Sequence, residues 1–184
     1  GLERTVCTLN SCKTVYETDA FTNIIAKISE LSGKHYDDDE ATTKAFRIVA
    51  DHLRTSTFIM GDPRGVSPSN VDQGYVLRRL IRRAIREGRK LGITGNFTAK
   101  IAEAISEEFG DVYPELRRQK AVICEELNRE EKQFAVTLEK GTHEFQKLID
   151  RVPPHINKKV ISGKNAFNLY ETLSLIHISE PTRP

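Results

Sequence analysis

The sequence lacks the features that mark several classes of protein. Its three cysteines are an odd number and form no disulfide framework, and no His or Cys pair with zinc-ligand spacing follows Cys7 and Cys12. No apolar stretch approaches the ~20 residues of a membrane span, and no signal peptide is visible. Neither a glycine-rich phosphate loop nor a nucleophile–base pair is recognisable. These absences predict a cytoplasmic protein with no metal site, no membrane partner and no catalytic residue of its own.

The chain also lacks an excess of charge of one sign, because its 28 Lys and Arg residues are nearly balanced by 26 Asp and Glu residues and the net charge is +2. Any attraction to nucleic acid must therefore be local. With 184 residues and 38% hydrophobic content, the chain can bury the core of one or two modest domains.

Basic residues are concentrated in one predicted helix, residues 74–90. At about 100° per residue, the apolar side chains of this helix share one side, and the opposite arc holds the cations. The cations are Arg78, Arg79, Arg82, Arg83, Arg86, Arg89 and Lys90, and Glu87 is the single anion. Such a face attracts phosphate. A solvated face whose long side chains cover apolar neighbours is the alternative, and composition alone does not separate the two.

Helical periodicity runs through most of the chain and predicts an all-α fold, a multi-helix bundle with one long coiled-coil-like helix. Thr18 is a candidate N-cap for the first predicted helix, and Gly33 is a candidate stop. Prolines and glycines interrupt the helices between residues 61 and 68. The predicted helices cover residues 19–31, 40–60, 74–90, 97–109 and 115–150, with a short one near 165–170.

The longest predicted helix carries an apolar seam about three heptads long. Its members alternate spacings of four and seven: Ile123, Leu127, Phe134, Leu138, Phe145 and Ile149. A seam packed against another helix is the ordinary explanation, and a dimer zipper is the alternative.

The last twelve residues, 173–184, differ from the rest of the chain. They show neither clear periodicity nor continuity with the preceding helix, and they resemble the translated read-through of a transposon-type sequencing adapter. We interpret this segment as a non-native tail and exclude it from inferences about fold and function.

Two neighbouring motifs are the most distinctive in the chain: Ser67-Pro68-Ser69-Asn70 and the following Gly74-Tyr75-Val76-Leu77-Arg78-Arg79-Leu80-Ile81-Arg82-Arg83-Ala84. Together they resemble the alanyl-tRNA synthetase family of class II aminoacyl-tRNA synthetases. The segment 45–54, the opening Gly1-Leu2-Glu3-Arg4 and the segment 163–172 agree with the family in the same order. The resemblance covers residues 1–172.

The resemblance implies a division of the chain. Residues 1–16 resemble the C-terminal remnant of the class II catalytic domain, in which Arg4, at the end of motif 3, would bind ATP. Residues 17–172 resemble the helical tRNA-recognition domain. The other catalytic motifs, which act with ATP, Mg²⁺ and alanine, are expected upstream, and the zinc-containing editing region is expected downstream. The fragment itself is expected to hold no cofactor.

The resemblance also implies how the chain reads RNA. In this family a G·U wobble pair in the tRNA(Ala) acceptor stem specifies alanine, and the residues that read it correspond to Asn70 and Glu171. The family commonly has Asp where this chain has Glu171, so the carboxylate here reaches one methylene further. The cations Arg78, Arg79, Arg82, Arg83 and Arg86 would hold the tRNA backbone. Asn70 alternatively serves as a turn residue.

The expected function therefore has two layers. The parent protein would be an alanine–tRNA ligase that uses ATP to attach alanine to its tRNA. The fragment would bind the tRNA acceptor stem and be inactive alone. The alternative is a free-standing, non-enzymatic helical module that binds RNA or another protein.

Overall fold

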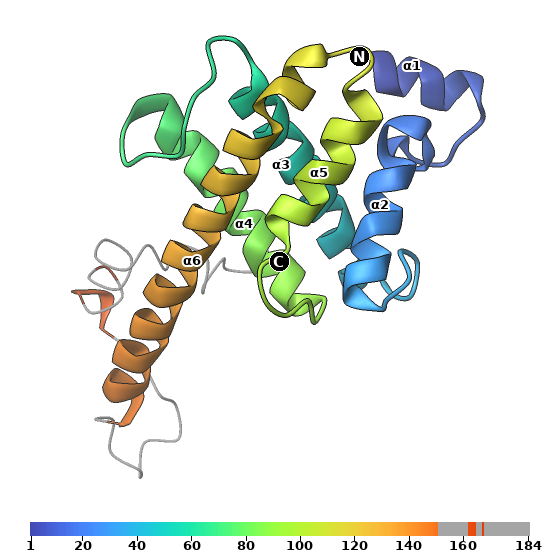
Figure 1. Cartoon of the computed structure of the whole chain (residues 1–184). Helices are drawn as coiled ribbons and strands as arrows, with labels where there is room; N and C mark the ends of the chain where they lie inside the picture. The colour runs from blue at the N-terminus through green and yellow to red at the C-terminus, as the bar shows by residue number, and fades with distance from the viewer. Residues whose placement is uncertain (151–161, 165–166, 168–184) are drawn as a thin grey trace. The chain divides into compact units, whose positions relative to one another are not determined.

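Every regular element in the described part of the chain is a helix. The structure is a computed structural model that describes residues 1–150, 162–164 and 167. Figure 1 shows the order of the elements, which are α1 (Leu2–Leu9), the 3-10 turn η1 (Val15–Glu17), α2 (Asp19–Ser32), α3 (Glu40–Gly61), α4 (Asp72–Lys90), α5 (Thr98–Phe109) and α6 (Pro114–Asp150). The prediction of an all-α bundle is confirmed for these residues. None of their helices is both long enough and apolar enough to cross a bilayer.

The ends of α2 differ in how well the sequence predicted them. Gly33 ends the helix in the left-handed conformation, with φ +68°, and its N–H donates to the Ser29 carbonyl at 2.8 Å. This is the predicted glycine stop. Thr18 precedes the helix, but its hydroxyl donates to the Val15 carbonyl at 2.6 Å and makes no capping bond. Thr18 therefore ties the helix to η1 instead of capping it.

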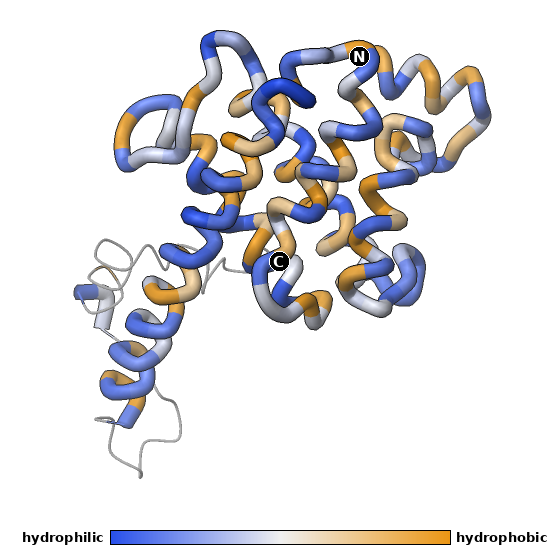
Figure 2. The backbone as a smooth tube through the Cα atoms, in the orientation of Figure 1, coloured by the Kyte–Doolittle hydropathy of each residue, from blue (hydrophilic) through white to orange (hydrophobic). Residues whose placement is uncertain are grey.

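The chain forms two compact units, residues 1–131 and 132–184. In the first unit α3 packs along α4 and also contacts α2 and α5. In Figure 2 apolar and polar stretches recur along each of these helices, as expected of amphipathic helices that pack around a shared core. The fully buried side chains of this core include Ile24, Ile28, Phe46, Leu53, Leu77, Ile81, Ile101 and Ile105.

The part of α6 that belongs to the first unit contributes to the same core. Leu116, Ile123 and Leu127 are all completely buried. A Cβ on Gly61, the last residue of α3, would lie 2.5 Å from Cδ2 of Leu116, so the glycine permits this close approach. Two members of the predicted seam, Ile123 and Leu127, are thus buried as a packed seam requires. In the second unit Leu138, Phe145 and Ile149 are half-buried.

Some predictions fall outside the described residues or are not tested by them. The tail 173–184 lies outside, as does the short helix near 165–170 apart from Phe167. Residues 1–16 belong to the first compact unit, where α1 contacts η1. The division at residue 16 into a catalytic remnant and a recognition domain stays a prediction.

Candidate nucleic-acid interface

The cations of α4 point in several directions and do not form one open face. Arg78, Arg82 and Arg89 turn toward α6, and their side chains are 16%, 15% and 34% exposed. Arg79 and Lys90 are the exposed residues among the seven cations. The solvated face that composition allowed is therefore limited to part of the helix.

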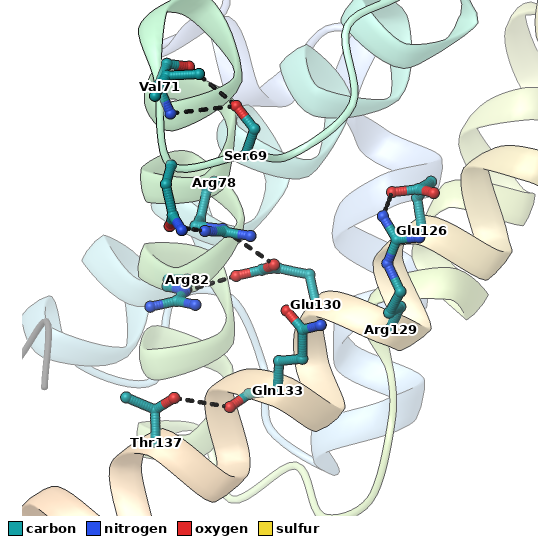
Figure 3. Close-up of polar contacts among 10 residues, drawn as sticks. Ser69, Val71, Arg78, Arg82, Glu126, Arg129, Glu130, Gln133 and Thr137 are labelled. Atoms are coloured by element: carbon teal, nitrogen blue, oxygen red, sulfur yellow. Dashed lines mark hydrogen bonds and ion pairs between the residues drawn. The ribbon is translucent and has the colours of Figure 1, made fainter.

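Glu130 on α6 holds two of these arginines. Its side chain is 3% exposed, and its two carboxylate oxygens accept separately from the two guanidinium groups. Nε of Arg78 lies 3.2 Å from Oε2, and Nε of Arg82 lies 2.6 Å from Oε1 (Figure 3). A buried carboxylate is costly unless it is paired and hydrogen-bonded. The two ion pairs therefore stabilise the carboxylate and fix both arginine side chains.

Glu131, the next residue, is completely buried and connects three segments. Its Oε1 accepts from Nη2 of Arg89 at 3.3 Å. Its Oε2 accepts from the backbone N–H groups of Phe97 and Thr98, both at 3.1 Å, and from the Thr98 hydroxyl at 2.7 Å. The residue before α5 supplies no capping side chain, so Glu131 takes that role from another helix. The carboxylate also lies where a helix N-terminus favours negative charge.

Glu87, near the C-terminal end of α4, is buried beside two cations of its own helix. Its carboxylate accepts from Nη2 of Arg86 at 2.9 Å and from Nζ of Lys90 at 3.0 Å. Burial raises the pKa of Glu87, but hydrogen bonds from Lys90 and Arg86 outweigh it, so the pKa lies below its ordinary value. Glu87 thereby neutralises part of the basic helix.

Arg83 lies on the side of α4 that lines a cavity of about 680 Å³ between α4, α3 and Tyr16. Lys44, Arg47 and Asp51 of α3 line the same cavity. Nε of Arg83 is buried and has no hydrogen-bond partner among the described residues. Arg83 is therefore separated from the arginines that pair with α6.

The N-terminal end of α4 presents an exposed aromatic–cation pair. The guanidinium carbon of Arg79 lies 5.8 Å from the centroid of the Tyr75 ring, and both residues are exposed. No ion pair involves Arg79 within the described ranges. Among the predicted backbone-binding residues, Arg79 is thus the one whose charge faces solvent directly.

Asn70 lies on the turn that leads into α4 and is exposed. The Ser69 hydroxyl stabilises this turn, because it donates to the Val71 carbonyl at 2.9 Å and accepts from the Val71 N–H at 3.3 Å. Oδ1 of Asn70 accepts a hydrogen bond from Nη1 of Arg78. The predicted base-reading residue and one predicted backbone-binding residue are therefore in direct contact. Glu171, the second predicted base-reading residue, lies outside the described residues.

Sequence reasoning missed Glu130 and Glu131 as partners of the basic helix. Their positions carried a signal, because they follow Leu127 by three and four residues and precede Phe134 by four and three. Both glutamates therefore lie next to the apolar seam of α6. Carboxylates beside a buried seam indicate buried cationic partners.

The described residues offer few groups that could hold the ATP or metal ions expected from the resemblance. Arg4 is exposed on α1, and its carbonyl accepts from the Thr8 hydroxyl at 2.9 Å. Its neighbour Glu3 pairs with Arg54 at 2.9 Å. No group of three or more His, Cys, Asp or Glu side chains suited to a metal occurs in the described part of the chain. One exposed arginine does not make a nucleotide site.

Comparisons with known proteins agree with the motifs. The family model described as tRNA synthetases class II (A) matches residues 1–176. The protein named alanine–tRNA ligase in Treponema pallidum (strain Nichols) is 44% identical over 172 residues, which is 94% of this chain and 28% of the relative. Its counterpart in Treponema denticola is 48% identical over 172 residues, with the same coverage. That in Thermotoga petrophila is 40% identical over 175 residues, or 95% of this chain and 19% of the relative.

The chain spans about 28% of the length of the first two of these relatives. The resemblance to alanyl-tRNA synthetases that the motifs indicated is confirmed, and the matched region contains every helix from α1 to α6. The chain belongs to the class II (A) family of tRNA synthetases.

Proposed function

We propose that this chain is the acceptor-stem-binding part of an alanine–tRNA ligase. The parent protein activates alanine with ATP and Mg²⁺ and transfers it to the 3′ end of tRNA(Ala). Family membership supports this proposal, and so do the names of relatives that are 44% and 48% identical. No observation favours the alternative of a free-standing RNA-binding or protein-interaction module.

The observation that carries the proposal is the position of Asn70. An exposed side-chain amide lies on a short turn immediately before the basic helix and contacts its first arginine. Base edges of A-form RNA are accessible in the shallow minor groove, where a wobble pair differs from a Watson–Crick pair. Asn70, together with Glu171, would read the G·U pair there.

The basic residues would hold the RNA backbone beside this site. Arg79 faces solvent and is the most direct candidate for a phosphate contact. Arg78, Arg82 and Arg86 already pair with carboxylates, so each would approach a phosphate with part of its charge neutralised. Arg83, which lines the cavity beside α3, would bind apart from the arginines that pair with α6.

The remaining parts of the proposal concern the parent protein. Arg4 would bind ATP only when the rest of the catalytic domain orients it. Zinc would belong to the editing region, and the ligase would act in the cytoplasm.

Two measurements on the purified chain test the proposal. Its affinity for an acceptor-stem minihelix is expected to fall steeply with salt, because each phosphate contact releases counterions; on a log–log plot the slope is about −0.9 per contact for duplex DNA. A flat salt response would remove the basic residues from the interface. The chain is also expected to form no alanyl-adenylate from alanine and ATP, and formation of the adenylate would contradict a purely RNA-binding role.

A further inference from the structure

A continuous chain of hydrogen bonds connects the interior of the first unit to Asn70. The buried carboxylate of Glu130 accepts from Nε of Arg78 at 3.2 Å, and Nη1 of the same guanidinium donates to Oδ1 of Asn70. The second oxygen of Glu130 accepts from Arg82 at 2.6 Å, which fixes the carboxylate from the other side (Figure 3). One edge of the Arg78 guanidinium is therefore held by Glu130, and the other edge contacts Asn70.

This arrangement determines which way the Asn70 amide faces. Arginine has only hydrogen-bond donors, so the atom of Asn70 that it contacts must be the amide oxygen. The NH₂ group, which has no acceptor among the described residues, then faces solvent with both hydrogens available. Without Arg78 the exposed amide would rotate and present either its oxygen or its nitrogen.

We propose that Glu130 is a positioning residue that acts through Arg78 and makes Asn70 a hydrogen-bond donor to RNA. The inference rests on the proposed function and adds the chemical class of the group that Asn70 recognises. That group is an acceptor: a pyrimidine O2, a purine N3 or a ribose oxygen in the minor groove. A guanine exocyclic amine is a donor and is left to another residue.

The charge of Glu130 matters as well as its position. A carboxylate gives strong, short hydrogen bonds to both guanidinium groups, whereas a neutral amide in its place offers one weaker acceptor. Glu130→Gln therefore keeps the side-chain volume but releases Arg78. The variant also loses one negative charge, so its non-specific attraction to RNA does not fall.

The test is a binding assay with the full chain and two minihelices that differ only in a G·U or G·C pair, at one salt concentration. Glu130→Gln is expected to reduce the G·U preference by about tenfold, the equivalent of one charge-assisted hydrogen bond, without weakening binding to the G·C minihelix. The matched control is Glu126→Gln on the same helix, because Glu126 pairs with the exposed Arg129 (Figure 3). This control is expected to keep the wild-type preference.

A second variant tests the donor directly. Asn70→Asp keeps an acceptor for Arg78 but removes the NH₂ group, so it is expected to lose the G·U preference. In the double variant Glu130→Gln/Asn70→Ala, the preference is expected to equal that of Asn70→Ala alone, because Glu130 acts only through Asn70.

Each possible outcome decides the proposal. A folded Glu130→Gln chain with the full preference, or an Asn70→Asp chain that retains it, overturns the inference while the proposed function stands. If Glu130→Gln does not fold, Arg78→Lys is used instead, since it keeps the charge but lacks the planar guanidinium whose two edges contact Glu130 and Asn70; an unchanged preference in that variant overturns the inference. A wild-type chain with no preference overturns both the proposed function and the inference.

Discussion

Glu131 in α6 caps α5 through Thr98, its first residue, by accepting from the Thr98 backbone N–H at 3.1 Å and from the Thr98 hydroxyl at 2.7 Å. The two residues are far apart in the sequence, and the carboxylate is completely buried. The long helix thus joins α4 and α5 through one side chain, since Arg89 of α4 binds the other carboxylate oxygen.

Removing this carboxylate is expected to destabilise the chain strongly. Glu131→Ala leaves Arg89 without its carboxylate partner and two backbone N–H groups without an acceptor, so the free energy of unfolding is expected to fall by about 3–5 kcal/mol. Urea denaturation followed by circular dichroism measures it. Glu131→Gln retains an acceptor for Thr98 and is expected to lose less. A loss below about 0.5 kcal/mol in Glu131→Ala would show that the buried network contributes little.

The helices show what the sequence alone predicts well. The predicted segments 19–31, 40–60 and 97–109 correspond to Asp19–Ser32, Glu40–Gly61 and Thr98–Phe109. Periodicity is a local property, and glycine or proline residues mark most of the ends, so no long-range information is needed. Helix α1 was not predicted because eight residues carry too few turns for a clear pattern.

The cations of α4 show why the candidate site was only partly predictable from the sequence. A helical projection correctly groups the cations of α4 opposite its apolar side, but it does not reveal what packs on the projected surface. Arg78 and Glu130 lie 52 positions apart in sequence, and Arg89 and Glu131 lie 42 apart. Their pairing depends on the path of the chain between the helices. The helical projection therefore overestimated how many of these cations face solvent.

Acid is expected to weaken the first unit partly through Glu87. Because the pKa of Glu87 is lower in the folded chain than its ordinary value of 4.5, ionised Glu87 stabilises the fold. This contribution is fully present above pH 4.5 and is lost as the pH falls through the folded-state pKa. The difference in unfolding free energy between the wild type and Glu87→Gln is expected to shrink between neutral pH and about pH 3.5. A difference that is constant over this range would contradict the assignment.

Gly88 in α4 is expected to be necessary for stability, because the Phe97 ring packs directly against it. A Cβ on Gly88 would lie 2.2 Å from Cζ of Phe97, whose ring is 1% exposed. Gly88→Ala is therefore expected to lower the free energy of unfolding by about 1–3 kcal/mol, despite the better helix propensity of alanine. Thermal or urea denaturation measures the change. In the double variant Gly88→Ala/Phe97→Leu the smaller side chain is expected to relieve part of the clash. A Gly88→Ala chain as stable as the wild type would show that the Phe97 ring moves freely.

Two arginines of α4 are expected to respond differently to neutralisation. Arg79→Gln removes an exposed charge, so it should weaken binding to G·U and G·C minihelices equally and reduce the salt slope by about 1. Its stability should stay within about 0.5 kcal/mol of the wild type. Arg82→Gln leaves the buried Glu130 with one guanidinium and should cost about 2 kcal/mol of stability. Equal effects of the two substitutions on stability would contradict the difference between the exposed Arg79 and Arg82, which pairs with Glu130.

The measurement that tests the proposed function most directly is the affinity of the purified chain for a G·U acceptor-stem minihelix against that for an otherwise identical G·C minihelix. The wild type is expected to prefer G·U, and Asn70→Ala is expected to bind both equally with its salt dependence unchanged. Equal binding of the two minihelices by the wild type would contradict acceptor-stem recognition and leave only attraction to the RNA backbone.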